Sequence, residues 1–314
     1  MAFALDTEIA ATLAGLAAAA RPEQPAPGDP LALREFIDPG LELSFGRLPD
    51  WPDVETVDHA APSAEGASVP MRWYTKKNSS PGSAVVYVHG GGMICGSVSV
   101  YDRLVRHYVG LTGVPFLAVD YRLAPEYADV GLGKDVLAGI KWLHDKASEF
   151  GIDPSRIAIM GDSGGGGVGA AAAIQARDAG VALARQILIY PMLDDRNLTP
   201  DPQIAATALW TYEHNRTAWT AVLGDRLGGE GVPASVVPSR LTDFAGLAPA
   251  YIEVGELDIF RDESIAYASG LYAAGISCEL HVHPGAPHSH DWINQNSTLC
   301  GRVVEDRIRV IHSI

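Results

Sequence analysis

The chain of 314 residues contains only three cysteines, Cys95, Cys278 and Cys300, and they lie far apart. An odd number at wide spacing fits neither a disulfide framework nor the paired spacing of a zinc site. We therefore expect reduced thiols in a cytoplasmic protein, and neither a metal nor another cofactor. Charged residues make up only 19% of the chain and hydrophobic residues 47%, a balance that argues against disorder.

Positive charge is scarce, since 23 lysines and arginines stand against 38 aspartates and glutamates, for a formal net charge of −15. Such a chain repels phosphate backbones and anionic lipids, so we expect no nucleic-acid and no membrane partner. No apolar run reaches the length of a membrane span. The stretch Ile9–Ala20 follows Asp6 and Glu8, where a signal peptide would carry positive charge. We interpret residues 5–20 as an amphipathic surface helix.

What the chain does contain is a rhythm of short, continuous apolar runs that alternate with helical patterns. Continuous runs are typical of strands buried on both faces of a parallel sheet. Helical spacing is clearest over residues 134–150, and we expect further helices at 166–180 and 263–275. This alternation predicts an α/β fold in which helices flank a mostly parallel central sheet. The runs are Ala84–Val88, Phe116–Val119, Ile157–Met160, Ile187–Tyr190 and Tyr251–Val254.

The same patterns divide the chain into a core and two other segments. We expect the core over residues 54–193 and 241–314, beginning with strands Val54–His59 and Val69–Tyr74 around a turn at 63–66. Residues 21–53 are rich in proline and acidic residues and predict an irregular arm. Residues 194–240 have no strong strand pattern and several aromatic residues, which is typical of a cap inserted over a site. These aromatic residues are Trp210, Tyr212 and Trp219.

One serine follows a predicted strand in the pattern of a catalytic nucleophile, Gly161-Asp162-Ser163-Gly164-Gly165. A turn from strand to helix this tight strains the serine backbone and leaves no room for side chains at Gly161 and Gly165. It exposes the hydroxyl and points the helix N-terminus at a developing oxyanion. A phosphate loop is excluded because no Lys-Ser or Lys-Thr pair follows the glycines. Trypsin-like proteases share the Gly-Asp-Ser-Gly-Gly sequence around their serine. They are all-β and place histidine and aspartate before the serine, so they do not fit this chain.

A second glycine-rich segment, His89-Gly90-Gly91-Gly92, follows the predicted strand Ala84–Val88. Three glycines allow backbone N–H groups to approach a substrate without side chains between them. Together with the N–H of Gly164, such donors can stabilise the tetrahedral intermediate of acyl transfer. We expect His89 to shape this loop and not to act as a base.

In this architecture the acid and the base follow the serine in chain order. Asp258 comes just after a predicted strand, and His288 lies in a loop after the strand-like run Glu279–His283. The histidine would take the serine proton and return it to the leaving group, while the carboxylate fixes the histidine tautomer. The alternatives are Glu256 and Asp262 for the acid, and His283 and His290 for the base.

Four histidines, His281, His283, His288 and His290, could also form a metal site. The alternation of side chains along a strand produces the His-x-His spacing without any metal, and the spacing is not a strong zinc signature. We therefore assign no metal ligands.

These segments together resemble the hormone-sensitive-lipase family of α/β-hydrolases, the bacterial family IV esterases, over roughly residues 70–295. The resemblance implies the α/β-hydrolase fold, with a helical cap built from the N-terminal arm, residues 1–53, and from residues near 200–230. It also implies a homodimer formed through a sheet edge. The matching segments are residues 89–92, 120–126, 161–165, 255–263 and 284–288.

The resemblance further implies site residues. They are Ser163, Asp258 and His288 as the catalytic triad, and Gly90, Gly91 and Gly164 as the oxyanion hole. The chain departs from the family pattern at Gly164, where alanine is usual, and at Ser289-His290, where Gly-Phe is usual.

The complete set predicts a serine hydrolase that cleaves carboxylic esters of small or short-chain acids through an acyl-enzyme. The partner is a small-molecule ester, and we expect Met93, Trp210 and Trp219 to contact it. The same triad could hydrolyse lactones, carbamates or amides. A ligand receptor on this scaffold is a third alternative, which a histidine at the expected position disfavours.

Overall fold

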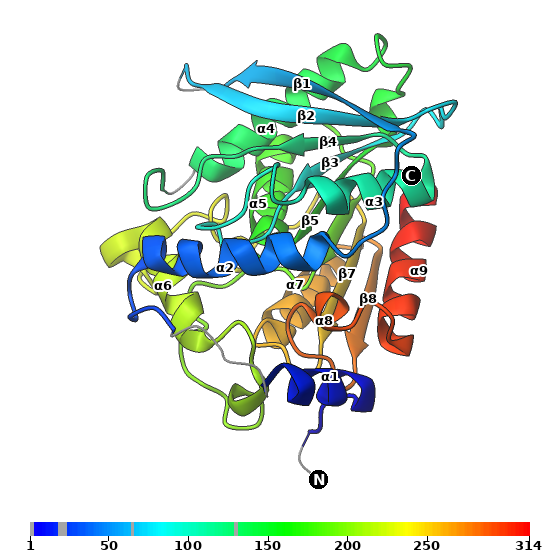
Figure 1. The fold of residues 1–314 in the computed structure, drawn as a ribbon. Coiled ribbons are helices and arrows are strands. Elements are labelled where there is room, and N and C mark those ends of the chain that lie inside the picture. Colours follow the sequence, from blue (N-terminus) through cyan, green and yellow to red (C-terminus); the bar gives the residue numbers. More distant parts are fainter. Residues whose placement is uncertain (1–2, 18–23, 64–65, 129–130) are drawn as a thin grey trace.

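The computed structural model describes residues 3–17, 24–63, 66–128 and 131–314. Its centre is an eight-stranded sheet with the order β1-β2-β4-β3-β5-β6-β7-β8 (Figure 1). Strands β1 (Val54–Pro62) and β2 (Ser68–Lys76) form an antiparallel hairpin, and β2 is also antiparallel to β4 (Phe116–Val119). The remaining neighbours are parallel. The mostly parallel sheet predicted from the apolar runs is confirmed. Residues 64–65 of the predicted turn lie outside the described residues.

The middle of the sheet is buried on both faces. Every residue of the five strands between the β1–β2 hairpin and the last strand is buried, which explains their continuous apolar sequences. The last strand, β8 (Cys278–His283), forms the other edge of the sheet and is only half-buried. These five strands are β4, whose bounds are given above, β3 (Ala84–Val88), β5 (Ile157–Asp162), β6 (Gln186–Ile189) and β7 (Ala250–Gly255).

Helices cover both faces of the sheet. Helices α3 (Asp102–Thr112) and α9 (Thr298–His312) contact each other on one face, and α4 (Gly131–Lys146) contacts α5 (Gly164–Asp178) on the other (Figure 1). Helix α7 (Arg261–Ala273) follows β7. Three of these helices, α4, α5 and α7, begin within three residues of the predicted starts. Helices α3 and α9 were not predicted.

The expectation of an irregular arm over residues 21–53 is wrong, because Pro30–Phe45 forms helix α2. Asp29 caps its N-terminus by accepting hydrogen bonds from the N–H groups of Leu31 and Ala32. Pro39 lies inside the helix, where proline removes a hydrogen bond. The helix persists because Leu33, Ile37, Leu41 and Phe45 recur every four residues and pack against the core.

The N-terminal helix α1 (Thr7–Ala17) covers most of the predicted stretch, and residues 18–20 lie outside the described residues. It is docked to the core, since Ile9 is fully buried in a cluster with Ala286, Leu299 and Val303. In the described part of the chain, no helix has the length and apolar character that crossing a membrane requires.

Residues 194–240 contain no strand and one long helix, α6 (Tyr212–Leu223), with short 3-10 helices around it. Helix α6 contacts α2, and the Gly28 N–H donates to Thr217 Oγ at 3.1 Å. Two segments far apart in sequence therefore lie side by side (Figure 1). Helix α8 (His290–Ile293) is a single turn after β8.

Candidate active site

Ser163 lies in the turn between β5 and α5, with a left-handed backbone of φ 54° and ψ −123°. The flanking glycines leave no room for side chains. A Cβ at Gly161 would lie 2.4 Å from the Gly165 carbonyl oxygen, and one at Gly165 would lie 2.2 Å from that of Val88. The glycine spacing thus follows from the close approach of β3, β5 and α5.

Three predicted side chains meet at the carboxyl ends of the parallel strands. Ser163 Oγ is 2.9 Å from His288 Nε2, and His288 Nδ1 is 2.7 Å from Asp258 Oδ2. Because a carboxylate only accepts, Nδ1 carries the proton and Nε2 is free to accept from the serine hydroxyl. Ser163, His288 and Asp258 are all buried, with Asp258 fully so.

Three of the four alternative acids and bases have other partners, whereas the buried Nε2 of His283 has no hydrogen-bond partner in the described part of the chain. Glu256 accepts from the Gly285 N–H, and Asp262 pairs with Arg261. His290 Nδ1 lies 3.2 Å from the Pro287 carbonyl oxygen.

Two aromatic rings fix the plane of the His288 imidazole. Tyr190 and Phe260 meet it edge to face, with ring centroids 4.8 and 5.1 Å away. Tyr190 itself has a strained φ of 35° and donates from its hydroxyl to Asp291 at 3.1 Å. Sequence patterns did not identify either ring, although each comes at or just after the end of a predicted strand.

The glycine loop packs directly against the helix that follows Ser163. In the described part of the chain, the N–H groups of Gly90, Gly91 and Gly92 donate to no protein acceptor. Gly91 lines the cavity at Ser163, whereas a Cβ at Gly90 would collide with Asp162 Oδ2 at 2.3 Å. The amide of Gly92 lies beside Gly164, since a Cβ placed on Gly164 would be 2.7 Å from Gly92 N. His89 shapes the loop as expected, with Nδ1 2.9 Å from the Gly90 carbonyl oxygen.

A cavity of about 230 Å³ surrounds Ser163 and His288. Helix α2 contributes Phe36, Ile37 and Leu41 to its wall, and residues 194–240 contribute Leu209, Trp210 and His214.

Of the three residues expected to contact substrate, only Trp210 is among the described lining residues of this cavity. Trp219 is fully buried in the hydrophobic core. The Met93 side chain is also buried, and its methyl group would lie 3.1 Å from a Cβ on Gly167 of α5. Aromatic composition alone did not separate the residue that lines the cavity from the one that packs beneath it.

Asp162, beside Ser163, is a buried carboxyl whose oxygens accept from the hydroxyls of Tyr87 at 2.7 Å and Tyr101 at 3.1 Å. Burial raises the pKa of Asp162 to about 6, although these hydrogen bonds oppose the rise.

Beneath the loop that carries His288, a guanidinium is buried between two carboxylates. Arg307 of α9 donates to Glu253 and to Asp291 Oδ2 at 2.6 Å, and all three side chains are fully buried. Burial is the largest influence on Asp291 and by itself would raise its pKa. The charges of Arg307 and His290, together with the hydrogen bonds from Arg307 and Tyr190, outweigh burial and hold that pKa below its ordinary value.

Among the described residues, two groups of three side chains could hold a metal ion, with one ligand atom of each within 4.8 Å of the others. In the half-buried group of Glu279, His281 and Asp306, Arg309 already pairs with both carboxylates. The other group is Glu253, His283 and His290. Arg307 already supplies a cation to Glu253, and the second oxygen of this carboxylate accepts from Tyr251 at 2.5 Å. The guanidinium would repel a metal ion, so this cluster fits one poorly, and the absence of metal ligands stays a prediction.

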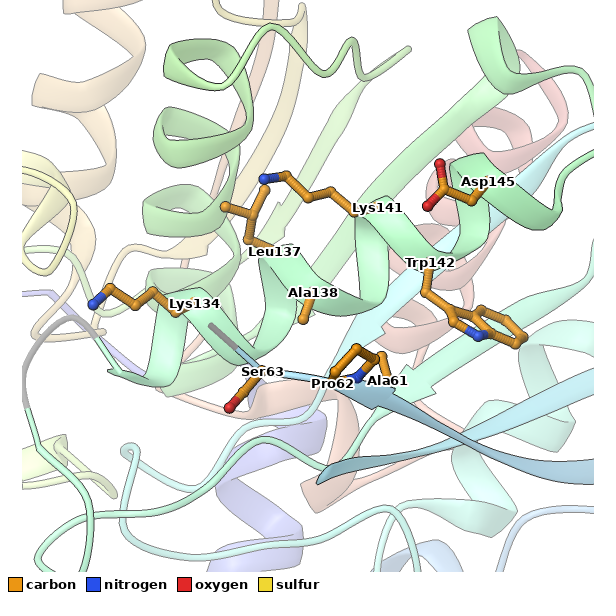
Figure 2. A pocket seen from close by; sticks show the side chains of 9 residues that line it. All are labelled: Ala61, Pro62, Ser63, Lys134, Leu137, Ala138, Lys141, Trp142 and Asp145. Carbon is orange, nitrogen blue, oxygen red and sulfur yellow. The ribbon is translucent and has the colours of Figure 1, made fainter. Parts of the chain in front are cut away.

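Another hollow lies on the surface between β1 and α4 (Figure 2). Lys134, Lys141 and Trp142 project from α4 around it, with Pro62 at the end of β1. Ser63 Oγ accepts from the Ala67 N–H there, and none of the described lining residues is a histidine that could activate it. In the described part of the chain, the hydrogen-bonded series of serine, histidine and carboxylate lies around Ser163 and not at this hollow.

Comparison with known proteins gives a consistent result. Residues 85–291 match the model of a family described as having the alpha/beta hydrolase fold. The chain is 32% identical to ethyl acetate hydrolase from Pseudomonas putida, over 80% of this chain and 79% of that protein. It is 33% identical to the esterase LipI from Mycobacterium tuberculosis, over 81% and 82%. Among solved structures, a bacterial heroin esterase superposes with a TM-score of 0.86 at 33% identity, covering 98% of this chain and 97% of the other.

Proposed function

Because the chain belongs to the α/β-hydrolase family, among the esterases related to hormone-sensitive lipase, and is a carboxylic ester hydrolase, we propose that Ser163, His288 and Asp258 form its catalytic triad. The observation that carries the proposal is the unbroken chain of hydrogen bonds from Ser163 Oγ through the imidazole of His288 to Asp258.

In the proposed reaction, Ser163 Oγ attacks the ester carbonyl carbon while its proton passes to His288 Nε2. Asp258 stabilises the imidazolium that results. The carbonyl oxygen becomes an oxyanion, and the intermediate collapses as His288 gives its proton to the departing alcohol. Water then attacks the acyl-enzyme with His288 as base, which releases the acid and restores the serine.

We propose that the oxyanion accepts hydrogen bonds from the N–H of Gly164 and from the glycine loop. Gly91 faces the cavity, and the Gly92 amide lies beside Gly164, so these two positions suit the role better than Gly90. Each such donor contributes roughly 3–4 kcal/mol to transition-state stabilisation in known hydrolases.

The cap in this proposal consists of the arm within residues 1–53, mainly α2, and the insertion 194–240, mainly α6. Both line the cavity, whose volume of about 230 Å³ supports a preference for small or short-chain acyl groups. We also propose that the exposed edge of β8 pairs two copies into a homodimer, which light scattering on the purified protein would check.

The triad is tested with p-nitrophenyl esters of increasing acyl length. We expect acetate and butyrate to be cleaved fastest, and Ser163→Ala to lower kcat by roughly 10⁴-fold or more. Ser155→Ala, at an exposed 3-10 turn, is the matched control and should keep full activity. A fluorophosphonate should label wild-type protein at one site and leave Ser163→Ala unlabelled. Near-normal hydrolysis by Ser163→Ala would refute the assignment.

A further inference from the structure

We infer that helix α2 does more than cover the cavity. Its residues Asp38 and Arg34 position the glycine loop, taken here as residues 89–96, and so set the geometry of the oxyanion hole. This inference rests on the proposed function. Both are positioning residues, because their contacts are with the loop backbone and with Glu126.

Asp38 holds the far end of the loop. Its Oδ1 accepts a hydrogen bond of 2.8 Å from the N–H of Gly96. Gly96 has a left-handed φ of 82°, and a Cβ there would lie 2.8 Å from both the Gly90 carbonyl oxygen and His89 Nδ1. Gly96, at the end of the loop, therefore packs directly against His89 and Gly90 at its beginning, and a contact that fixes Gly96 also fixes Gly90.

Arg34 holds the same loop from one helical turn earlier. Its Nε donates to the Ile94 carbonyl oxygen, and Nη2 donates to that of Ala124 at 2.9 Å. Glu126 orients the guanidinium through two hydrogen bonds of 2.8 Å. The hydrogen bond with Arg34 lowers the pKa of Glu126 to about 2, so the pair stays charged across the ordinary pH range.

The loop between these anchors is a closed turn. The Gly91 carbonyl accepts from the N–H groups of Ile94 at 3.1 Å and Cys95 at 2.8 Å. The Ala124 N–H donates to the Met93 carbonyl at 3.0 Å. A displacement of Ile94 or Cys95 is thus carried to Gly91 by these backbone hydrogen bonds.

Helix α2 is itself fixed firmly enough to serve as an anchor. Phe45 is buried, with its ring 4.7 Å from that of Tyr101 and 5.1 Å from that of Trp292. Tyr101 in turn donates to Asp162 beside the nucleophile. The helix and the nucleophile turn therefore share one packed environment, and the loop is held between them.

The test is Asp38→Ala, measured with p-nitrophenyl butyrate and with a trifluoromethyl ketone that forms a tetrahedral adduct with the serine. A loosened oxyanion hole weakens transition-state binding more than substrate binding. We expect kcat to fall about 10-fold, KM to stay within about twofold, and the ketone to bind about 10-fold more weakly. Asp38→Asn keeps an acceptor oxygen and should recover most of the activity. Arg34→Gln gives an independent second variant with the same expected pattern.

Asp29→Ala is the matched control, because it removes the N-cap of the same helix at a site without contact to the loop. It should lower the free energy of unfolding by about 1 kcal/mol and leave kcat unchanged. The inference is overturned if Asp38→Ala and Asp29→Ala lower kcat equally, or if Asp38→Ala raises KM alone. If the wild-type protein itself does not hydrolyse esters, the proposed function is refuted. This outcome differs from the two results that would overturn the inference about Asp38, because both of those require an active wild-type enzyme.

Discussion

Gly164 shows how closely the glycine loop approaches the start of helix α5. A Cβ at this position would lie 2.7 Å from Gly92 Cα, Gly92 N and Met93 N. All three are backbone atoms, so they can give way only if the glycine loop moves. The family usually has alanine at this position. In this chain the glycine loop lies so close to Gly164 that a methyl group does not fit between them.

We therefore expect Gly164→Ala to lower kcat for p-nitrophenyl butyrate by about 10-fold, equivalent to about 1.4 kcal/mol of barrier. Gly169→Ala on the same helix is the control, because its Cβ would meet nothing nearer than Ile159 at 3.7 Å. That substitution should keep kcat and raise stability by up to about 1 kcal/mol. Equal activity of both variants would show that the loop tolerates the methyl group.

Asp162 gives a prediction about pH. Its pKa in the folded protein is raised from 3.8 to about 6, mainly by burial. Between these values the folded protein holds a proton that the unfolded chain releases, so this group's contribution to the free energy of unfolding falls as pH rises.

Asp162→Asn is neutral at every pH and should gain stability relative to wild type between pH 4 and 6, by at most roughly 3 kcal/mol. Urea unfolding of both proteins at pH 4, 5 and 6.5 measures this difference. A difference that is constant across the series would contradict the raised pKa.

At the scale of elements, one residue of α9 joins three parts of the structure. Arg307 pairs with Glu253 on β7 and with Asp291 on α8, three residues after His288. Replacing it with methionine would leave two buried carboxylates without their cation. We expect Arg307→Met to lower the free energy of unfolding by roughly 3–5 kcal/mol, measured by urea denaturation.

Arg309 on the same helix offers the comparison. Its ion pairs with Glu279 and Asp306 are half-exposed, and exposed pairs contribute little. Arg309→Met should change stability by less than about 1 kcal/mol. If the two variants were equally stable, the buried cluster would contribute no more than a surface pair.

Elements also differ in how far the sequence predicts them. The buried strands were found within a residue or two because both of their faces are apolar, as in Ala84–Val88. Helix α2 was missed because Pro39 and the acidic residues around it favour irregular structure. The cap at Asp29 and the four-residue spacing of the apolar residues were local signals for a helix. What the sequence does not show is that Phe45 and its neighbours find a core to pack against, and this packing offsets the cost of Pro39.

For the whole molecule, the site combines predictable and unpredictable parts. Glycine spacing and chain order pointed to Ser163, Asp258 and His288, which the structure brings into contact. Their catalytic roles remain predictions. The cavity wall could not be predicted, because it depends on how α2 and residues 194–240 meet. Trp219 was chosen by composition and lies in the core, whereas Phe36 and His214 line the cavity.

The wall between two cavities gives a prediction at this scale. His214 and Gln24 line both the cavity at Ser163 and a neighbouring apolar cavity of about 400 Å³, and their side chains lie 3.3 Å apart. We expect His214→Ala to join the cavities and raise the ratio of kcat/KM for octanoate over acetate esters by about 10-fold. That is the effect of burying roughly two more methylene groups of the octanoyl chain, at about 0.8 kcal/mol each.

Glu213→Ala is the control, because Glu213 lines only the second cavity. Its acyl-length profile should match that of wild type. If the acyl-length profile of His214→Ala were also unchanged, a residue other than His214 would limit the length of the acyl chain that the cavity accepts.

The order of the strands has a consequence for how activity arises in time. Ser163 and His288 are 125 residues apart, and the strand that precedes His288 is the last to be made and lies at the sheet edge. Contacts of such long separation form late in folding. If Ser163 and His288 act together as proposed, we expect a nascent chain that has formed its serine turn but not yet docked β8 to have no esterase activity. During refolding, the return of esterase activity should report when β8 docks, later than the return of helical circular dichroism.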